Sequence, residues 1–183
     1  MGNWIKIRAA GATMTRYVIR EATVGDAATI AGHRVSMFRD MGQVPSDALA
    51  AELLERSTLA LDAFLREGSY VGWFAVDESC RVLAGVGAHV KPQLPRISHD
   101  GVAVVTTAVP LVVNVYTEPQ LRGQGIARAL MTTLMKWATS RGFDRVFLHA
   151  SEFGRPLYQS LGFVVSNEMR WSPKRPSVGR RVP

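Results

Sequence analysis

Cysteine is nearly absent from this chain of 183 residues, because Cys80 is the only one. A single thiol can form neither a disulfide within the chain nor a thiolate metal cluster, which is typical of proteins kept in a reducing cytoplasm. Histidine is also sparse, and no pair has the i,i+4 spacing of zinc-binding helices; the histidines are His33, His89, His99 and His149. The sequence therefore predicts a cytoplasmic protein without a metal.

Long hydrophobic runs are absent as well. The longest apolar stretch, 102–116, is interrupted by Pro110 and is shorter than the roughly 20 apolar residues that a membrane helix needs. Residues 1–13 lack the continuous apolar core of a signal peptide, because Lys6 and Arg8 interrupt it. We expect no membrane partner, and we expect residues 1–13 to form an N-terminal extension.

Acidic residues are outnumbered by basic ones, which gives a net charge of +7. Part of the excess lies in residues 173–183, which contain four basic side chains and no acid. Such a segment attracts polyanions, but its composition of proline and arginine without apolar periodicity is typical of a flexible, solvated tail. The chain also lacks interleaved aromatic residues and nucleic-acid recognition motifs, so a nucleic-acid partner is the least favoured one.

The first half of the chain has the periodicity of a strand, two helices and a hairpin. The expected elements are a strand over 17–20, helices over 26–42 and 46–68, strands over 71–76 and 82–90, and a loop over 91–101. Each helix begins at a capping residue, Asp26 or Ser46, and ends at a glycine.

The second half is predicted to alternate strands and helices. The expected elements are a strand over 111–117, an amphipathic helix over 125–141, a strand over 145–150, a short helix over 155–161 and a hairpin of 163–165 with 168–171. The sequence has no internal repeat and no linker. Residues 14–172 are therefore predicted to form a single α+β domain of three α/β layers.

A glycine-bearing turn joins the strand at 111–117 to the helix at 125–141. The first N–H groups of a helix have no intrahelical partner and its dipole is positive there, so the junction favours an anion. Glycine lets the backbone approach a pyrophosphate closely, and Arg122 adds a fixed charge. An ordinary turn between strand and helix is the alternative.

Two familiar nucleotide-binding loops do not fit this turn. A Walker A loop requires a lysine after its last glycine, whereas Ile126 follows Gly125. A Rossmann fingerprint requires a third glycine where Arg128 stands, and it belongs to the first strand–helix unit of a domain.

The turn instead resembles the coenzyme A signature of the GNAT N-acetyltransferase superfamily, Arg/Gln-x-x-Gly-x-Gly/Ala. Every specified position is matched by Arg122-Gly123-Gln124-Gly125-Ile126-Ala127. Downstream, the family's Leu-Tyr-x-x-x-Gly-Phe is matched by Leu157-Tyr158-Gln159-Ser160-Leu161-Gly162-Phe163. The resemblance implies acetyl-CoA as co-substrate and a mixed, splayed central sheet flanked by helices. The fourth and fifth strands of that sheet would part to admit the pantetheine arm.

The resemblance also implies roles for individual residues at the cofactor. The main-chain N–H of Val115 would hold the thioester carbonyl, and the pantetheine amides would pair with the backbone of Val115, Tyr116 and Thr117. The phosphates would lie against the six residues of the signature. Seven residues before Tyr158 the family often has an asparagine that contacts the cofactor arm, whereas this chain has Ser151, whose hydroxyl reaches less far.

Acetyl transfer from a thioester to an amine requires a base for an ammonium of pKa about 10.4, donors for the oxyanion and an acid for a thiolate of pKa about 8.5. The resemblance assigns the acid to Tyr158, with core packing of the ring as the alternative. The base stays open. Glu118, at the end of the fourth strand, is the candidate, and the alternatives are Glu152, His149, His33 or a water chain.

The predicted function is N-acetylation of a primary amine on a small molecule, amino acid or peptide, by direct attack on acetyl-CoA. The alternative from another class is a non-catalytic acyl-CoA sensor. We expect acceptor contacts from the first two helices and from residues 91–101, and a homodimer is left open. The motifs do not identify the acceptor.

Overall fold

The computed structural model describes residues 5–8, 14–98, 100–105, 108–171 and 173. The first elements are β1 Ile5–Arg8, β2 Met14–Glu21, η1 Val24–Asp26, α1 Ala27–Asp40, α2 Asp47–Glu67, β3 Tyr70–Asp77 and β4 Val82–Lys91. The others are β5 Arg96–Ile97, β6 Val104–Val105, β7 Val109–Thr117, η2 Pro119–Leu121, α3 Ile126–Ser140, β8 Phe147–Leu148 and α4 Arg155–Ser160.

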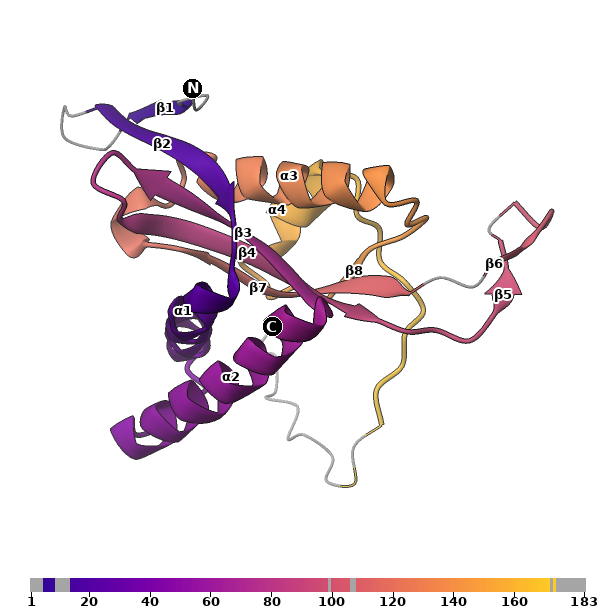
Figure 1. The fold of residues 1–183 in the computed structure, drawn as a ribbon, viewed down its shortest axis with the longest axis horizontal. Helices are drawn as coiled ribbons and strands as arrows, with labels where there is room; N and C mark the ends of the chain where they lie inside the picture. Colours follow the sequence, from indigo (N-terminus) through magenta and orange to yellow (C-terminus); the bar gives the residue numbers. More distant parts are fainter. Residues whose placement is uncertain (1–4, 9–13, 99, 106–107, 172, 174–183) are drawn as a thin grey trace, which may run out of the picture.

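Three layers make up the fold, with a six-stranded sheet in the middle (Figure 1). The strand order is β1-β2-β3-β4-β7-β8, and only the last pair is parallel. α1 and α2 cover one face, and α3 and α4 cover the other. A separate hydrophobic cluster fills each side, one around Leu83, Leu130 and Leu134 and one around Ile30 and Phe74. The predicted α+β fold, with a mixed and splayed sheet flanked by helices, is confirmed.

The predicted helix boundaries follow from local chemistry. The Ser46 hydroxyl accepts the Leu49 N–H at 3.3 Å and begins α2, which ends at Gly68 with φ 72°. Asp26 precedes α1 as expected, but its carboxylate accepts the Thr23 N–H at 2.8 Å and so closes the preceding turn η1. Arg20 donates two hydrogen bonds to the same carboxylate.

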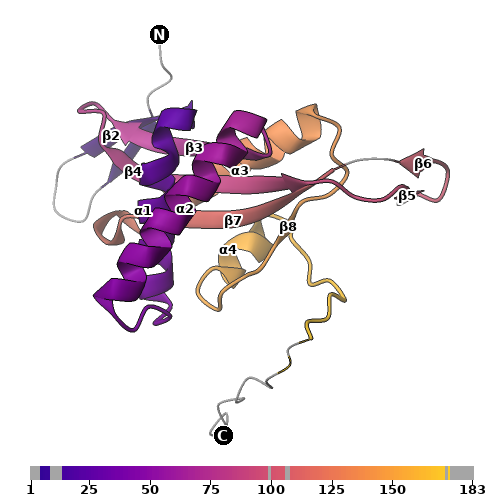
Figure 2. The same cartoon turned by 60° about the horizontal axis from the view of Figure 1, so that its bottom comes forward.

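Several strands differ from the prediction. Part of the expected extension, Ile5–Arg8, pairs with β2, and the expected loop 91–101 contains β5, which pairs with β6. Both views show β5 and β6 projecting beyond the end of the sheet (Figure 2). Residues 1–4, 9–13 and 174–183, which include most of the predicted tail, lie outside the described residues.

Two strand predictions near the C-terminal end are wrong. The strand expected over 145–150 is reduced to Phe147–Leu148, and the hairpin expected over 163–171 does not form. Val164, Val165, Met169 and Trp171 are exposed, so this segment has a strand-like composition without a neighbouring strand to pair with. Periodicity detects such a composition, whereas pairing depends on the rest of the fold.

Close packing beneath α1 and α2 depends on small residues in β4. A Cβ placed on Gly87 would lie 1.8 Å from the Tyr70 hydroxyl oxygen and 2.3 Å from the ring carbon that carries it. Tyr70 is almost fully buried, and its hydroxyl accepts a hydrogen bond from the Asn114 side-chain amide at 3.3 Å. Glycine is therefore required at 87 so that the Tyr70 ring, which starts from β3, can lie over β4 and reach Asn114 of β7.

We predict that Gly87→Ala lowers the free energy of unfolding by about 1–3 kcal/mol, because the Tyr70 ring must move in a packed core. Gly32→Ala in α1 is the matched control, since a Cβ there has nothing within 4 Å. That variant should raise the stability by about 0.5–1 kcal/mol through better helix propensity. Urea unfolding measures both changes, and a Gly87→Ala variant as stable as wild type would contradict this packing.

Candidate active site

The strand β7 has unequal partners along its two edges. β4 pairs with it from Val109 to Thr117, whereas β8 pairs with it only at Leu111 and Val112. Beyond Val112 the second edge of β7 has no strand partner among the described residues. The predicted parting of these two strands is therefore present, and it leaves one edge of residues 113–117 open.

The register shows which backbone groups point to this open edge. The Glu118 N–H donates to the Leu83 carbonyl at 3.0 Å, so Glu118 and Tyr116 turn their main-chain groups toward β4. Main-chain groups alternate along an antiparallel strand, so Val115 and Thr117 turn theirs to the opposite edge. The Thr117 carbonyl there accepts the Arg122 Nε–H at 3.0 Å. The N–H of Val115, the predicted carbonyl donor, thus points to the edge of β7 that has no strand partner among the described residues.

A β-bulge sets the side chains of β7. Gly87 of β4 lies opposite Asn114 and Ala88 lies opposite Val112, so Val113 is an extra residue without a partner. Val113 and Asn114 consequently both contact the α1 and α2 layer. Val115 packs on the other side, against the cluster that also contacts Tyr158.

The predicted phosphate-binding turn begins where β7 ends. Gly123 has φ 75° and Gly125 has φ 82°, which is the left-handed region where glycine is favoured. α3 begins directly after Gly125, and its first backbone bond runs from the Ala129 N–H to the Gly125 carbonyl. The N–H groups of Ile126, Ala127 and Arg128 precede that bond and are the donors that a helix start offers to an anion.

Two buried polar atoms at this junction lack partners among the described residues. They are the Thr117 hydroxyl, at the end of β7, and the side-chain carbonyl of Gln124 in the turn. An unpaired buried polar atom is unfavourable, and the usual explanation is a ligand or water that completes it. Donor and acceptor atoms of this kind fit the amides and hydroxyls of a pantetheine–pyrophosphate chain, so the junction fits coenzyme A.

Arg122 links the turn to α1. Its Nη2 lies 2.5 Å from a carboxylate oxygen of Asp40, the last residue of α1, and its guanidinium lies 5.7 Å from the centre of the Tyr116 ring. The Arg122 side chain is exposed, and this charge is therefore available at the surface beside the glycines.

Tyr158 lies on α4, which follows β8 in the sequence. Burial raises the pKa of its phenol, and the hydroxyl has no hydrogen-bond partner among the described residues. A Cβ on Gly154 would lie 2.8 Å from the Tyr158 ring and 3.3 Å from the Ser151 hydroxyl. That hydroxyl accepts the Gly154 N–H at 3.1 Å, so Ser151 shapes the turn that positions the tyrosine. Ser151 and Tyr158 are thus brought together.

The candidate bases lie in different surroundings. His149 and Glu152 are exposed beyond β8, whereas Glu118 is half-buried at the end of β7 and its carboxylate makes no hydrogen bond within the described residues. His33 of α1 is buried between Phe74 and Tyr116, and burial lowers its pKa to about 4. His33 is therefore neutral at pH 7 and packs as a core residue.

A polar network that the sequence analysis missed lies beneath α1. The side-chain amide of Asn114 donates to Tyr70, and its carbonyl accepts from the Arg34 guanidinium at 3.0 Å. A single asparagine in a β-branched strand and an arginine in an amphipathic helix carry no motif. The only sequence signal was Asn114 itself, a polar residue in an otherwise apolar run.

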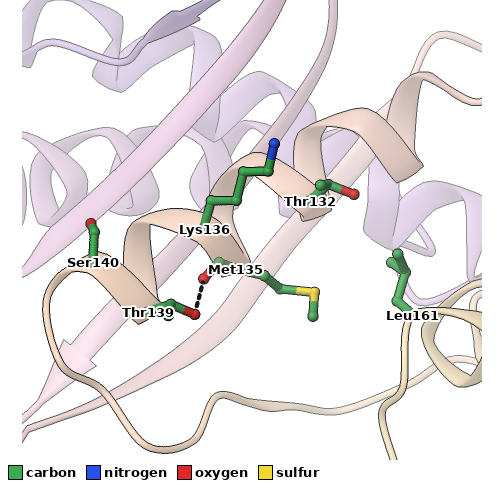
Figure 3. Close-up of a pocket in the computed structure, with 6 residues that line it drawn as sticks. All are labelled: Thr132, Met135, Lys136, Thr139, Ser140 and Leu161. Atoms are coloured by element: carbon green, nitrogen blue, oxygen red, sulfur yellow. Dashed lines mark hydrogen bonds between the residues drawn. The ribbon is translucent and has the colours of Figure 1, made fainter.

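An open depression lies elsewhere on the molecule, between the outer face of α3 and the end of α4 (Figure 3). Its lining residues are Thr132, Met135, Lys136, Thr139, Ser140 and Leu161. None of them belongs to the predicted site, and Thr139 is occupied by a hydrogen bond to the Met135 carbonyl.

Comparison with known proteins identifies the family. Residues 38–163, which span the open strand edge, the glycine turn and Tyr158, match the family model described as acetyltransferase (GNAT) family. The chain belongs to the GNAT acetyltransferase family. It is accordingly an acyltransferase, and the sensor alternative loses its support.

Solved structures agree with this GNAT assignment. A GCN5-related N-acetyltransferase from Ralstonia eutropha JMP134 is 30% identical, with a TM-score of 0.74 over 85% of this chain and 97% of that one. A predicted acetyltransferase from Clostridium acetobutylicum, solved with acetyl-CoA, is 26% identical, with a TM-score of 0.72 over 85% and 95% of the two chains.

A curated relative matches over a shorter segment. Glucosamine 6-phosphate N-acetyltransferase from Trypanosoma brucei brucei is 28% identical over 98 residues, which are 54% of this chain. The match spans 61% of the relative's own length.

Among the helices of the described chain, none has the length and apolar character needed to cross a membrane.

We predict that Gly125→Asp weakens binding of coenzyme A by at least about tenfold, or roughly 1.4 kcal/mol, because a carboxylate would face the pyrophosphate. Gly142→Asp is the matched control. Gly142 has φ 75° and follows the other end of α3, so the control introduces similar strain and the same charge away from the turn. Calorimetric titration should show a loss only for Gly125→Asp, and equal affinities for the two variants would contradict the assignment.

We predict a pH-dependent stability from His33. The unfolded chain protonates this histidine near pH 6.5, but the folded chain does so only near pH 4, so stability is complete above pH 6.5 and falls toward pH 4. The loss should reach roughly 3 kcal/mol, at about 1.36 kcal/mol for each pH unit. Asp26, with a pKa lowered to about 2, contributes only below this range.

Urea unfolding from pH 7 to pH 4 tests this prediction with His33→Gln and, as control, His149→Gln at an exposed position. His33→Gln should have a flatter pH dependence than wild type, and the control should retain the wild-type slope. An unchanged slope in His33→Gln would show that other groups cause the acid sensitivity.

Proposed function

We propose that this GNAT enzyme transfers an acetyl group from acetyl-CoA to the primary amine of a small molecule, amino acid or peptide by direct attack. The observation that carries the proposal is the continuity of three features along one chain segment. The open edge of β7 leads to unpartnered polar atoms at Thr117 and Gln124, and these lead to the glycine turn at the start of α3. An extended cofactor with amides followed by phosphates matches that order.

Main-chain groups would hold the cofactor. The amides of the pantetheine arm would pair with Val115 and Thr117, as an additional strand would. The main-chain groups of Tyr116, which were expected to pair as well, face β4 instead. The pyrophosphate would lie against the backbone of Arg122, Gly123, Gln124, Gly125, Ile126 and Ala127. Ser151 remains a proposed contact, because its hydroxyl proton is available while its oxygen accepts from Gly154.

Acetyl-CoA supplies the activated acyl group as a thioester. The amine nitrogen forms a bond to the carbonyl carbon while the bond from carbon to sulfur breaks, and the amine gives up one proton. The N–H of Val115 would stabilise the negative charge that develops on the carbonyl oxygen. We propose Glu118, directly or through water, as the acceptor of the amine proton, because this residue directly follows β7, the strand that carries Val115.

Tyr158 would donate its proton to the departing thiolate. A raised pKa keeps its phenol protonated at neutral pH, and the absence of a hydrogen-bond partner among the described residues leaves the proton available. The side chains of Val115 and Tyr158 pack against the same hydrophobic cluster, so the proposed acid lies on the face of the sheet to which the Val115 side chain points.

The relatives support amines as acceptors. The name of the trypanosomal relative specifies an amino sugar phosphate as its substrate, and this chain is similar to part of that protein. We therefore include amino sugars among the small amines to be tested first, beside amino acids and peptides.

We predict that Tyr158→Phe lowers kcat by about 100-fold or more and leaves KM for acetyl-CoA nearly unchanged, because only the proton is removed. Release of coenzyme A thiol with a panel of amines measures the rate. Tyr17→Phe is the control, since it removes another buried phenol, in β2, outside the site. A Tyr158→Phe enzyme with more than about half of wild-type turnover would show that Tyr158 is a packing residue.

A further inference from the structure

Arg34 differs from the other arginines whose side chains the structure describes in having neither a carboxylate partner nor an exposed position. Most arginine side chains there pair with an acid, as Arg39 does with Asp47. The others without a carboxylate partner are exposed; they are Arg128, Arg141, Arg155 and Arg170. Arg34 is half-buried, and burial lowers the pKa of its guanidinium, although an arginine in a protein remains charged.

Within the described residues, the contacts of Arg34 are all with neutral groups. Its Nη1 donates to the Asn114 side-chain carbonyl at 3.0 Å and to the Val113 main-chain carbonyl at 3.4 Å. Its guanidinium lies 4.8 Å from the centre of the Phe38 ring. The Nε and Nη2 groups make no hydrogen bond within the described residues. These two groups of the guanidinium are therefore free to donate a pair of hydrogen bonds to one anion.

These contacts fix the side chain without balancing its charge. A glutamine could donate a hydrogen bond to Asn114, and an apolar residue could cover Phe38. A partly desolvated positive charge is unfavourable unless an anion compensates it. The charge is therefore the feature of Arg34 that packing does not explain.

The position of Arg34 suggests which anion this is. α1 packs against one face of the sheet (Figure 1), and the hydrogen bond from Arg34 of α1 places the Asn114 side chain on that face. Val113 and Asn114 precede Val115 directly, so the atoms that anchor Arg34 lie roughly 3–7 Å along β7 from the proposed thioester site. Acceptor amines are expected on this side, because the cofactor segment is formed by β7, the glycine turn and α3.

We propose that Arg34 binds a carboxylate or phosphate group of the acceptor and so selects amines that carry an anionic group a few bonds from the nitrogen. This inference rests on the proposed acetyl transfer and names the substrate class. Asn114, held by Tyr70, fixes the guanidinium through Nη1, and its Nε and Nη2 donors are left for an anion. Carboxylate and phosphate both match a bidentate guanidinium.

The test uses matched acceptors that differ only in the anionic group, namely phosphoethanolamine with ethanolamine and glycine with glycinamide. The wild-type enzyme should use the anionic member of at least one pair more efficiently. In Arg34→Gln, kcat/KM for that anionic acceptor should fall about tenfold or more through KM, because a charged hydrogen bond is lost. The neutral acceptor and the affinity for acetyl-CoA should change less than about twofold.

Two further variants sharpen the result. Arg141→Gln, at the exposed end of α3, removes the same charge elsewhere and should leave the preference intact. Asn114→Asp places a carboxylate at the atom that now accepts from Arg34, and this internal anion should reduce the use of anionic acceptors as Arg34→Gln does. The Asp variant keeps Arg34 and a side chain of nearly the same shape at position 114, so it separates loss of the unbalanced charge from loss of packing.

Equal losses for charged and neutral acceptors in Arg34→Gln, or no preference in the wild type for either pair, would overturn the proposal. Calorimetric titration of phosphoethanolamine and glycine into the protein–coenzyme A complex separates this result from a failure of the proposed function. Binding that depends on Arg34 without thiol release would refute acetyl transfer to these amines and retain the anion site. Absence of such binding together with absence of turnover would refute the anion site.

Discussion

The site depends on the unequal pairing of β7. A strand interior to a sheet normally satisfies its backbone groups on both edges, and an edge strand leaves one row of donors and acceptors open. β7 is interior at Leu111 and Val112, where β8 pairs with it, and becomes an edge over the following residues. The transition exposes Val115 and Thr117 while β4 keeps the strand rigid along its other side. A thioester bound there would meet a donor whose position the sheet fixes in advance.

The bulge at Val113 extends this arrangement across the sheet. Without the extra residue, Val113 and Asn114 would face opposite layers, and the asparagine would lie in the apolar cluster beneath α3. With it, Asn114 reaches Tyr70 and Arg34 on the α1 side, and Val115 still packs beneath α3. One inserted residue thus places a polar network on the α1 face, directly before a backbone donor at the open edge of the sheet. Gly87 makes this possible, because a side chain there would occupy the space of the Tyr70 hydroxyl.

Local signals predicted what depends on local chemistry. Ser46 and Gly68 delimit α2, and Gly123 and Gly125 adopt the left-handed conformations that the turn before α3 requires. The pairing of distant segments was less predictable. Residues 145–150 and 163–171 have strand-like composition, but only Phe147–Leu148 finds a partner, because pairing depends on an adjacent strand edge and not on composition. The family resemblance predicted the cofactor segment, whereas no motif predicts a role for Arg34, because its significance depends on the absence of a carboxylate partner among the described residues and not on a spacing.

Two arginines near β7 differ in whether a carboxylate of the protein balances their charge. Arg122 already has an anion, Asp40, but this ion pair is exposed, and exposed pairs contribute only about 0–1 kcal/mol. A phosphate that accepted charge-assisted hydrogen bonds of about 1.5–3 kcal/mol each could displace Asp40 at little cost. Arg34 has no anionic partner among the described residues, and its half-buried setting makes the unbalanced charge more unfavourable than at the surface. An exchangeable pair suits a cofactor that enters and leaves in every turnover. An unbalanced charge instead discriminates among acceptors, because only a partner of opposite sign relieves it.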